Sequence, residues 1–159
     1  MTVSSNGTSI RTQGHLAAGL IAQSIGGGGG FLGINKTVYQ TRLGGYRSGI
    51  ANASDLSIDN TGSITTSGDN SAALIAQSIA GGGGSAALTG SPDLSITTSS
   101  WLHIGASETA SSIAGDLNIS NTSNLITTGN GSPALLLQSV GGGGGAVQAL
   151  NNPSVQSIL

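Results

Sequence analysis

The sequence predicts an all-β fold, a right-handed parallel β-helix or solenoid with glycine-rich turns and two irregular insertions. An apolar stretch that ends in a glycine run occurs three times, at 20–30, 74–84 and 136–145. Short segments rich in Ile, Thr and Ser lie between these runs, separated by Asn, Gly, Ser and Asp, which is typical of many-stranded β proteins. A recurring unit of this kind predicts stacked repeats, each burying its apolar face against its neighbours.

The composition supports strands over disorder or helix. Only 6% of the 159 residues are charged, against about 25% in an ordinary soluble domain. Disorder combines low hydrophobicity with high charge, whereas 36% of this chain is hydrophobic and 28 residues are glycine. Small apolar residues, hydroxyls and β-branched side chains favour strands joined by tight turns.

We expect one repeat domain over residues 1–159. Its central glutamines, Gln23, Gln77 and Gln138, are 54 and 61 residues apart. The repeat copies span about 9–30, 55–84 and 116–145, and the insertions span about 31–49 and 85–114.

Each copy reads as three short strands separated by turns. The first is Asp-Leu-x-Ile, at 55–58 and 116–119, with a partial echo at 93–96. The second aligns Ile10-Arg-Thr with Ile64-Thr-Thr and Ile126-Thr-Thr. The third is Leu-Ile-Ala-Gln-Ser-Ile, which runs into the glycines.

Two arrangements of these strands are possible, hairpins or a coil. Two-residue hairpin loops favour Asn-Gly or Asp-Gly, and neither pair recurs from copy to copy at the repeated turns. A parallel coil pairs each strand with its equivalent one coil away, so that glutamine stacks on glutamine as a ladder. With coils of about 20 residues spaced about 4.8 Å apart, we expect seven or eight coils and a rod of roughly 35 Å.

A helix is the alternative for the third segment. Ser132 and Pro133 precede an apolar run that ends at Gly141, and serine, proline and glycine in these places are typical helix boundaries. The segment 69–81 is similar. Eight-residue helices are marginal by themselves, and Gly19 interrupts the first copy, so strands are favoured.

The charges argue against nucleic acid and are sorted along the chain. The net charge is −2, whereas nucleic-acid binding needs a basic patch. The basic residues precede residue 50 and the acidic ones follow it: Arg11, Lys36, Arg42 and Arg47, then Asp55, Asp59, Asp69, Asp93, Glu108 and Asp116. Two explanations are open. The charges form a sparse solvated surface, or they give the stack a functional polarity along its long axis.

Cysteine and long apolar segments are both absent from the sequence. Disulfides and thiolate metal sites are therefore excluded. No apolar run approaches the 18 residues of a membrane-spanning helix. The first residues lack the basic and apolar regions of a signal peptide, so we expect a fragment, or a secretion signal located elsewhere, and no membrane insertion by this segment.

The segments that follow the first two glycine runs carry the candidate partner-binding residues. The irregular excursions of repeat proteins are the usual place for recognition. Aromatic and basic side chains together can contact a sugar or an acidic partner by stacking and hydrogen bonding, or they can brace one end of the stack. The candidates are Phe31, Tyr39, Arg42, Tyr46, Arg47 and Trp101.

No catalytic, cofactor or metal site is predicted. The Gly-x-Gly-x-x-Gly match at 28–33 arises from polyglycine and precedes a strand-like segment instead of a helix. Calcium-binding glycine repeats place an aspartate after the glycines, where this chain has Phe31, Ser85 and Ala146. His15 occupies a turn position and is expected to be an exposed turn residue.

Carboxylates give only a weak enzyme hypothesis. His103 lies near Trp101, with Glu108 as its nearest carboxylate in the sequence. Glycan-cleaving enzymes need clustered carboxylates. Asp55 and Asp59 flank one predicted strand, but Ser120 replaces Asp59 in the next copy.

The repeat resembles a known family. The segment 64–84, Ile-Thr-Thr-Ser-Gly-Asp-Asn-Ser-Ala-Ala-Leu-Ile-Ala-Gln-Ser-Ile-Ala-Gly-Gly-Gly-Gly, is similar to repeats in the passenger regions of large bacterial autotransporter adhesins. The resemblance covers the three repeat copies. It implies a parallel β-helical stalk at the outer-membrane surface or outside the cell, and it carries no catalytic residues.

The leading hypothesis is a non-enzymatic, surface-exposed or secreted β-helical adhesin or stalk segment. Its partner would be a host or cell-surface protein or glycan. The second hypothesis is a self-assembling extracellular filament or structural subunit, because an open coil stack exposes unpaired strands at both ends. A polysaccharide-active β-helix enzyme is a third.

Overall fold

The computed structural model describes residues 1–34, 41–44, 50–88, 102–104 and 111–149, and these contain strands but no helix. Coil 1 comprises β1 (Thr2–Ser5), β2 (Ile10–Thr12), β3 (Leu20–Ile25), β4 (Gly29–Ile34) and β5 (Thr41–Leu43). Coil 2 comprises β6 (Leu56–Asn60), β7 (Ile64–Thr66), β8 (Leu74–Ile79), β9 (Gly83–Leu88) and β10 (Leu102–Ile104). Coil 3 comprises β11 (Leu117–Asn121), β12 (Leu125–Thr127), β13 (Leu135–Val140) and β14 (Gly144–Ala149).

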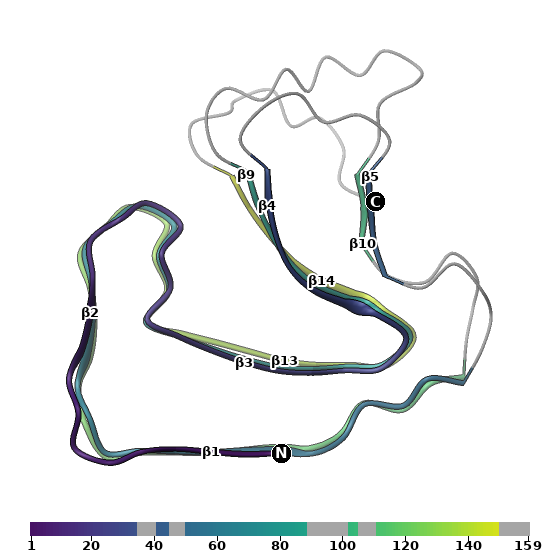
Figure 1. Ribbon diagram of the computed structural model, residues 1–159, viewed down its shortest axis with the longest axis horizontal. Coiled ribbons are helices and arrows are strands. Elements are labelled where there is room, and N and C mark those ends of the chain that lie inside the picture. The colour runs from purple at the N-terminus through teal and green to yellow at the C-terminus, as the bar shows by residue number, and fades with distance from the viewer. Residues whose placement is uncertain (35–40, 45–49, 89–101, 105–110, 150–159) are drawn as a thin grey trace.

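The strands pair in parallel, each with its equivalent one coil away. Strand β8 lies between β3 and β13, and Leu74 pairs with Leu20 on one side and Leu135 on the other. The same order holds for β1-β6-β11, β2-β7-β12 and β4-β9-β14. Viewed down the stack, the described parts of the three coils superpose (Figure 1). The parallel solenoid expected from the repeats is confirmed.

The size of one coil differs from the prediction. Register partners are 54 residues apart between Gln23 and Gln77 and 61 apart between Gln77 and Gln138. One whole sequence repeat therefore makes one coil, and the expected coil of about 20 residues was wrong. The physical reason is that the repeated turns bend the chain around the sides of one coil, so a full circuit needs every strand of the unit. Three coils spaced about 4.8 Å apart have a height of roughly 10 to 15 Å.

The helix alternative for the third segment was also wrong. Residues 74–79 and 135–140 are strands. The serine that resembles a helix cap has another role: Ser132 Oγ accepts a hydrogen bond from Ser71 N at 2.9 Å and donates one to Gly68 O at 2.9 Å. It therefore joins neighbouring coils.

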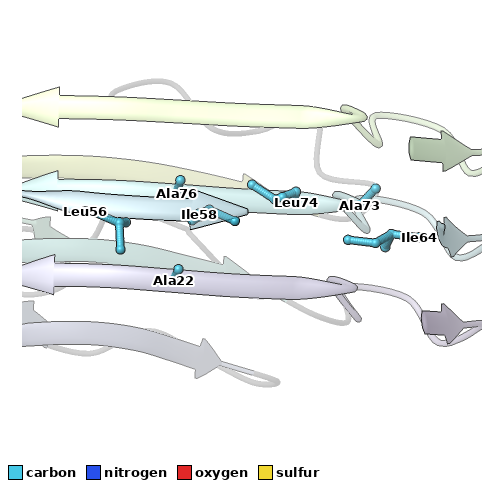
Figure 2. Packing of buried hydrophobic residues seen from close by; sticks show 7 residues of the cluster. All are labelled: Ala22, Leu56, Ile58, Ile64, Ala73, Leu74 and Ala76. Atoms are coloured by element: carbon cyan, nitrogen blue, oxygen red, sulfur yellow. The ribbon is translucent and has the colours of Figure 1, made fainter. Parts of the chain in front are cut away.

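The main hydrophobic core lies inside the loop formed by the first three strands of each coil. Strands β1 and β3 run along opposite sides of this loop and β2 along a third (Figure 1). The core cluster consists of Ala22, Leu56, Ile58, Ile64, Ala73, Leu74 and Ala76. Only Ala22 comes from coil 1, and Figure 2 shows it below the coil 2 members. Burying an aliphatic side chain contributes about 1.5–3 kcal/mol, so the middle coil holds much of the stabilisation.

A series of serines closes the fourth side of this core. Ser24 Oγ accepts a hydrogen bond from Ser54 N at 2.9 Å, and Ser78 Oγ accepts one from Gly115 N at 2.8 Å. Ser139 Oγ donates to Gly115 O at 3.0 Å. The third strand of each coil is thereby attached to the segment that precedes β6 or β11, and polar backbone groups at this junction gain partners.

The opposite face of β8 packs toward β9. Side chains alternate between the two faces of a strand, so Leu74 and Ala76 enter the core while Gln77 points the other way. Gln77 is fully buried, and Ser85 Oγ of β9 donates to Gln77 Oε1 at 2.9 Å. Gln23 Nε2 donates to Gln77 Oε1 at 2.5 Å, and Gln77 Nε2 donates to Gln138 Oε1. The predicted glutamine ladder is confirmed.

Glycines stack on glycines at the start of the fourth strand of each coil. Gly83 has φ +137°, and a Cβ there would overlap the carbonyl oxygen of Gly144. Gly84 has φ +132°, and its Cβ would overlap Gly30 O. L-residues rarely adopt such φ values, so both the backbone conformation and the close approach of neighbouring coils require glycine here.

One predicted alignment is shifted by a residue. Leu125, not Ile126, pairs with Ile64, while Ile126 pairs with Thr65. A shift of one residue moves a side chain to the other face of a strand. Leu125 accordingly packs against the core, and Ile126 is 44% exposed.

Candidate partner-binding surface

Phe31 is the candidate residue whose side chain the structure describes most fully. It lies on β4, just after the glycines, and is 44% exposed. Its register partners in coils 2 and 3 are the smaller residues Ser85 and Ala146. Coil 1 therefore carries an aromatic side chain at a position where the other coils have none, and its exposed ring area is available for stacking on a sugar or an apolar group.

Arg42 lies on β5, which contacts β4 and pairs in parallel with β10. Arg42 pairs in register with His103. The fold thus brings the strand of Phe31 next to that of Arg42, and it places a basic residue of coil 1 level with a histidine of coil 2.

The other predicted site residues lie outside the described residues. They are Tyr39, Tyr46, Arg47 and Trp101. Of the predicted candidate set, Phe31 and Arg42 are therefore the members that the described strands β4 and β5 hold.

His15 is an exposed turn residue, as predicted. Its side chain is 64% exposed, and its Nδ1 lies 3.6 Å from Asp69 Oδ2. The same nitrogen accepts a hydrogen bond from Asp69 N at 3.1 Å. One coil further, Asp69 Oδ1 accepts from Asn130 N at 2.8 Å. This set of side chains therefore caps the backbone of the next coil at each turn.

Of the carboxylates considered for glycan cleavage, Asp55 makes a similar structural contact, and Glu108 lies outside the described residues. Asp55 Oδ1 accepts a hydrogen bond from Asp116 N at 2.9 Å. Asp59 is exposed on β6, between Ser4 and Ser120 in register. Within the described ranges, no group of three or more His, Cys, Asp or Glu residues could hold a metal ion.

The sequence predicted open ends of the stack as a second candidate surface, but it did not identify the apolar residues exposed at the coil 3 end. Leu135 and Leu137 on β13 occupy the register positions of the buried residues Leu74 and Ala76, yet they are 42% and 44% exposed. Because the alternation of a strand predicts both to be core residues, the signal available was their place in the last repeat copy.

Comparison with known proteins gives no relative. No family model matches the chain, and neither the curated proteins nor the solved structures include a significant match. In the described part of the chain, no helix has the length and apolar character needed to cross a membrane.

Proposed function

We propose that this chain is a non-enzymatic β-helical stalk or adhesin segment of an autotransporter-like protein, exposed at the cell surface or secreted. The observation that carries the proposal is the coil-on-coil register: like residues stack through β3, β8 and β13, and the coils hold each other through backbone, amide and hydroxyl contacts. Such a stack makes a regular support that is lengthened by adding coils. In this proposal the coil is right-handed and its glycine runs form the tight corners.

The polar side chains of the described strands support a structural role. Thr12, Thr66 and Thr127 each donate to the carbonyl oxygen five residues later, at 2.6, 2.5 and 2.8 Å. The same hydrogen bond thus recurs in every coil. These hydrogen bonds fix the turn after the second strand. In a chain with few charges, hydrogen bonds of hydroxyl and amide side chains take the place of ion pairs.

Adhesion is assigned to the exposed Phe31 on β4 and to the adjacent strand β5, whose sequence includes Arg42. The stack supplies a rigid base, and residues held by rigid elements recognise partners with little loss of conformational entropy. A partner with an apolar or sugar face, bearing acidic groups, fits an aromatic residue and a basic residue on adjacent strands.

The test measures binding of cells and of glycan or matrix-protein arrays to the immobilised chain. Phe31→Ser introduces the residue that coil 2 carries in register, so the fold is expected to remain while retention falls severalfold. Ile126→Thr, an equally exposed apolar site on β12, is the matched control and should bind as the original chain does. Absence of saturable binding by the original chain, or equal binding by both variants, would contradict the adhesin proposal.

A further inference from the structure

The two ends of the coil stack are complementary to each other. The coil 1 face consists of the partly exposed residues Ile10, Leu20 and Gln23, with the backbone of the turn at His15. The coil 3 face consists of Leu125, Leu135, Leu137 and Gln138, with the side chain of Asn130. We propose that the coil 3 face binds the coil 1 face of a second copy of this chain, head to tail.

Register provides the first argument. Residues of both faces pair with the same coil 2 partners: Leu20 and Leu135 both pair with Leu74. Coil 2 therefore already binds a coil of each kind, one on either side. Placing coil 1 of a second copy after coil 3 would put Leu20 over Leu135, the same leucine-on-leucine contact found twice within the chain.

The direction of the glutamine ladder provides the second argument. Gln23 donates to Gln77, and Gln77 donates to Gln138. The ladder thus runs one way, with an amide carbonyl at its coil 1 end and an amide N–H group at its coil 3 end. Among the described residues, the partner of Gln138 Nε2 is Gly145 O, at a long 3.5 Å. A head-to-tail copy would offer it Gln23 Oε1 instead.

The turns are also polar along the stack, with donation in the opposite direction to that of the glutamine ladder. The side chains of His15 and Asp69 accept hydrogen bonds from backbone N–H groups of the following coil. Asn130, the equivalent residue of coil 3, is exposed, and its side-chain oxygen can accept from His15 N of the second copy. Two coil 3 faces brought together would instead oppose the amide N–H groups of two Gln138 side chains and the acceptor oxygens of two Asn130 side chains, so the polarity favours head-to-tail contact over head-to-head.

Apolar exposure supplies the driving force. Leu135 and Leu137 are 42% and 44% exposed at the coil 3 face, and covering them removes apolar surface from water. Because the two faces are different surfaces at opposite ends of the stack, the contact does not close on itself, and repeated association gives an open filament.

Solution association of the full chain is the main test. Sedimentation velocity over a concentration series, with electron microscopy of the same samples, should show growth from monomers to filaments whose coils are spaced about 4.8 Å apart along the axis. Gln138→Glu keeps the acceptor for Gln77 but directs a carboxylate at Gln23 Oε1, and should raise the concentration of half-assembly about tenfold or more. Asn118→Asp, the same amide-to-acid change at an exposed site on β11, should assemble normally.

Cross-linking tests the polarity in a chain that has no cysteine of its own. Arg11 and Ile126 are both exposed and pair with Thr65 in register. A mixture of Arg11→Cys and Ile126→Cys proteins should give cross-linked dimers, and neither protein alone should. Persistent monomers of the original chain, unchanged assembly of a folded Gln138→Glu variant, or Ile126→Cys homodimers would overturn the inference.

Circular dichroism establishes that each variant is folded. If Gln138→Glu unfolds, Leu137→Glu places the charge at an already exposed position and decides the same question. Adhesion is measured on immobilised protein and association in solution, so the proposed function and this inference can fail separately.

Discussion

Leu74 in the middle coil is fully buried, whereas Leu135, its register partner in coil 3, is 42% exposed. The two residues have the same type and the same strand position, and each follows an alanine in the sequence. They differ in what lies above them: Leu74 has a coil on each side, and Leu135 has a described coil on one side only. In a stacked fold, burial is therefore a property of position in the stack, because each coil contacts only its neighbours.

Glycine substitutions should give the largest difference between a stacked and an open position. Gly83→Ala places a Cβ on the carbonyl oxygen of Gly144, while Gly30→Ala meets nothing within 4 Å; both have φ near +137°. We expect Gly83→Ala to lower the free energy of unfolding by about 3 kcal/mol or more and Gly30→Ala by about 1 kcal/mol. Urea unfolding followed by circular dichroism measures both. Equal losses would show that backbone strain alone matters.

Leucine truncation sharpens the comparison in the core. Leu74→Ala should cost about 2–5 kcal/mol because it leaves a cavity, and Leu135→Ala about 1 kcal/mol because part of the site is already open to water. Thermal unfolding of dilute samples checks this. A Leu135→Ala loss as large as that of Leu74→Ala would mean that the coil 3 face is covered in solution.

The glutamine ladder should show the same asymmetry on a smaller scale. Gln77→Met removes partners from Gln23, Gln138 and Ser85 at once, so we expect a loss of about 2–3 kcal/mol. Gln138→Met removes one inter-coil partner at the open end and should cost about 1 kcal/mol. Urea midpoints at one protein concentration give both values. The ladder would have no role if Gln77→Met were neutral.

The smallest expected effect is a gain in stability. Asn60 is fully buried, and its Nδ2 donates to Gly62 O and Asn121 Oδ1, but its Oδ1 has no partner within the described structure. Its coil 1 register partner is Ser5. Ser5→Asn would place an amide donor at that oxygen and extend the asparagine ladder, so we expect a gain of about 1 kcal/mol.

Ser5→Ala is the matched control for this gain. It provides no donor and should leave the free energy of unfolding nearly unchanged. Thermal unfolding by circular dichroism compares the two variants. A Ser5→Asn variant no more stable than Ser5→Ala would show that the unpaired Asn60 oxygen does not lower the free energy of unfolding.

Much of the stack could be predicted, and the failures have identifiable causes. Copies aligned by Gln23, Gln77 and Gln138 predicted strands, parallel pairing and the ladder, because like residues stack only when equivalent strands pair. The helix alternative at 132–141 failed because Ser132 bonds to the neighbouring coil, a contact with no local sequence signature. The one-residue shift at Ile126 arose because Leu125-Ile126 offers two apolar residues in succession, and only the buried face selects between them.

The candidate surface was less accessible to sequence reasoning. Composition selected Phe31 and Arg42, but their strands, β4 and β5, are brought into contact only by the path of the coil. The exposed leucines of β13 carried no distinguishing pattern, since their alternation is that of core residues.

The sequence by itself determined the local pattern of this protein: short strands, hydroxyl-rich turns, recurring glycine runs and a repeat whose equivalent residues must stack. These follow from side-chain alternation and turn chemistry, which act over a few residues. The tertiary structure decided how many strands complete one coil, which glycines meet a neighbouring backbone and which leucines stay uncovered. Those features depend on how far the chain turns at each bend and on which coil lies above, and both are set by contacts between residues 54 or 61 positions apart.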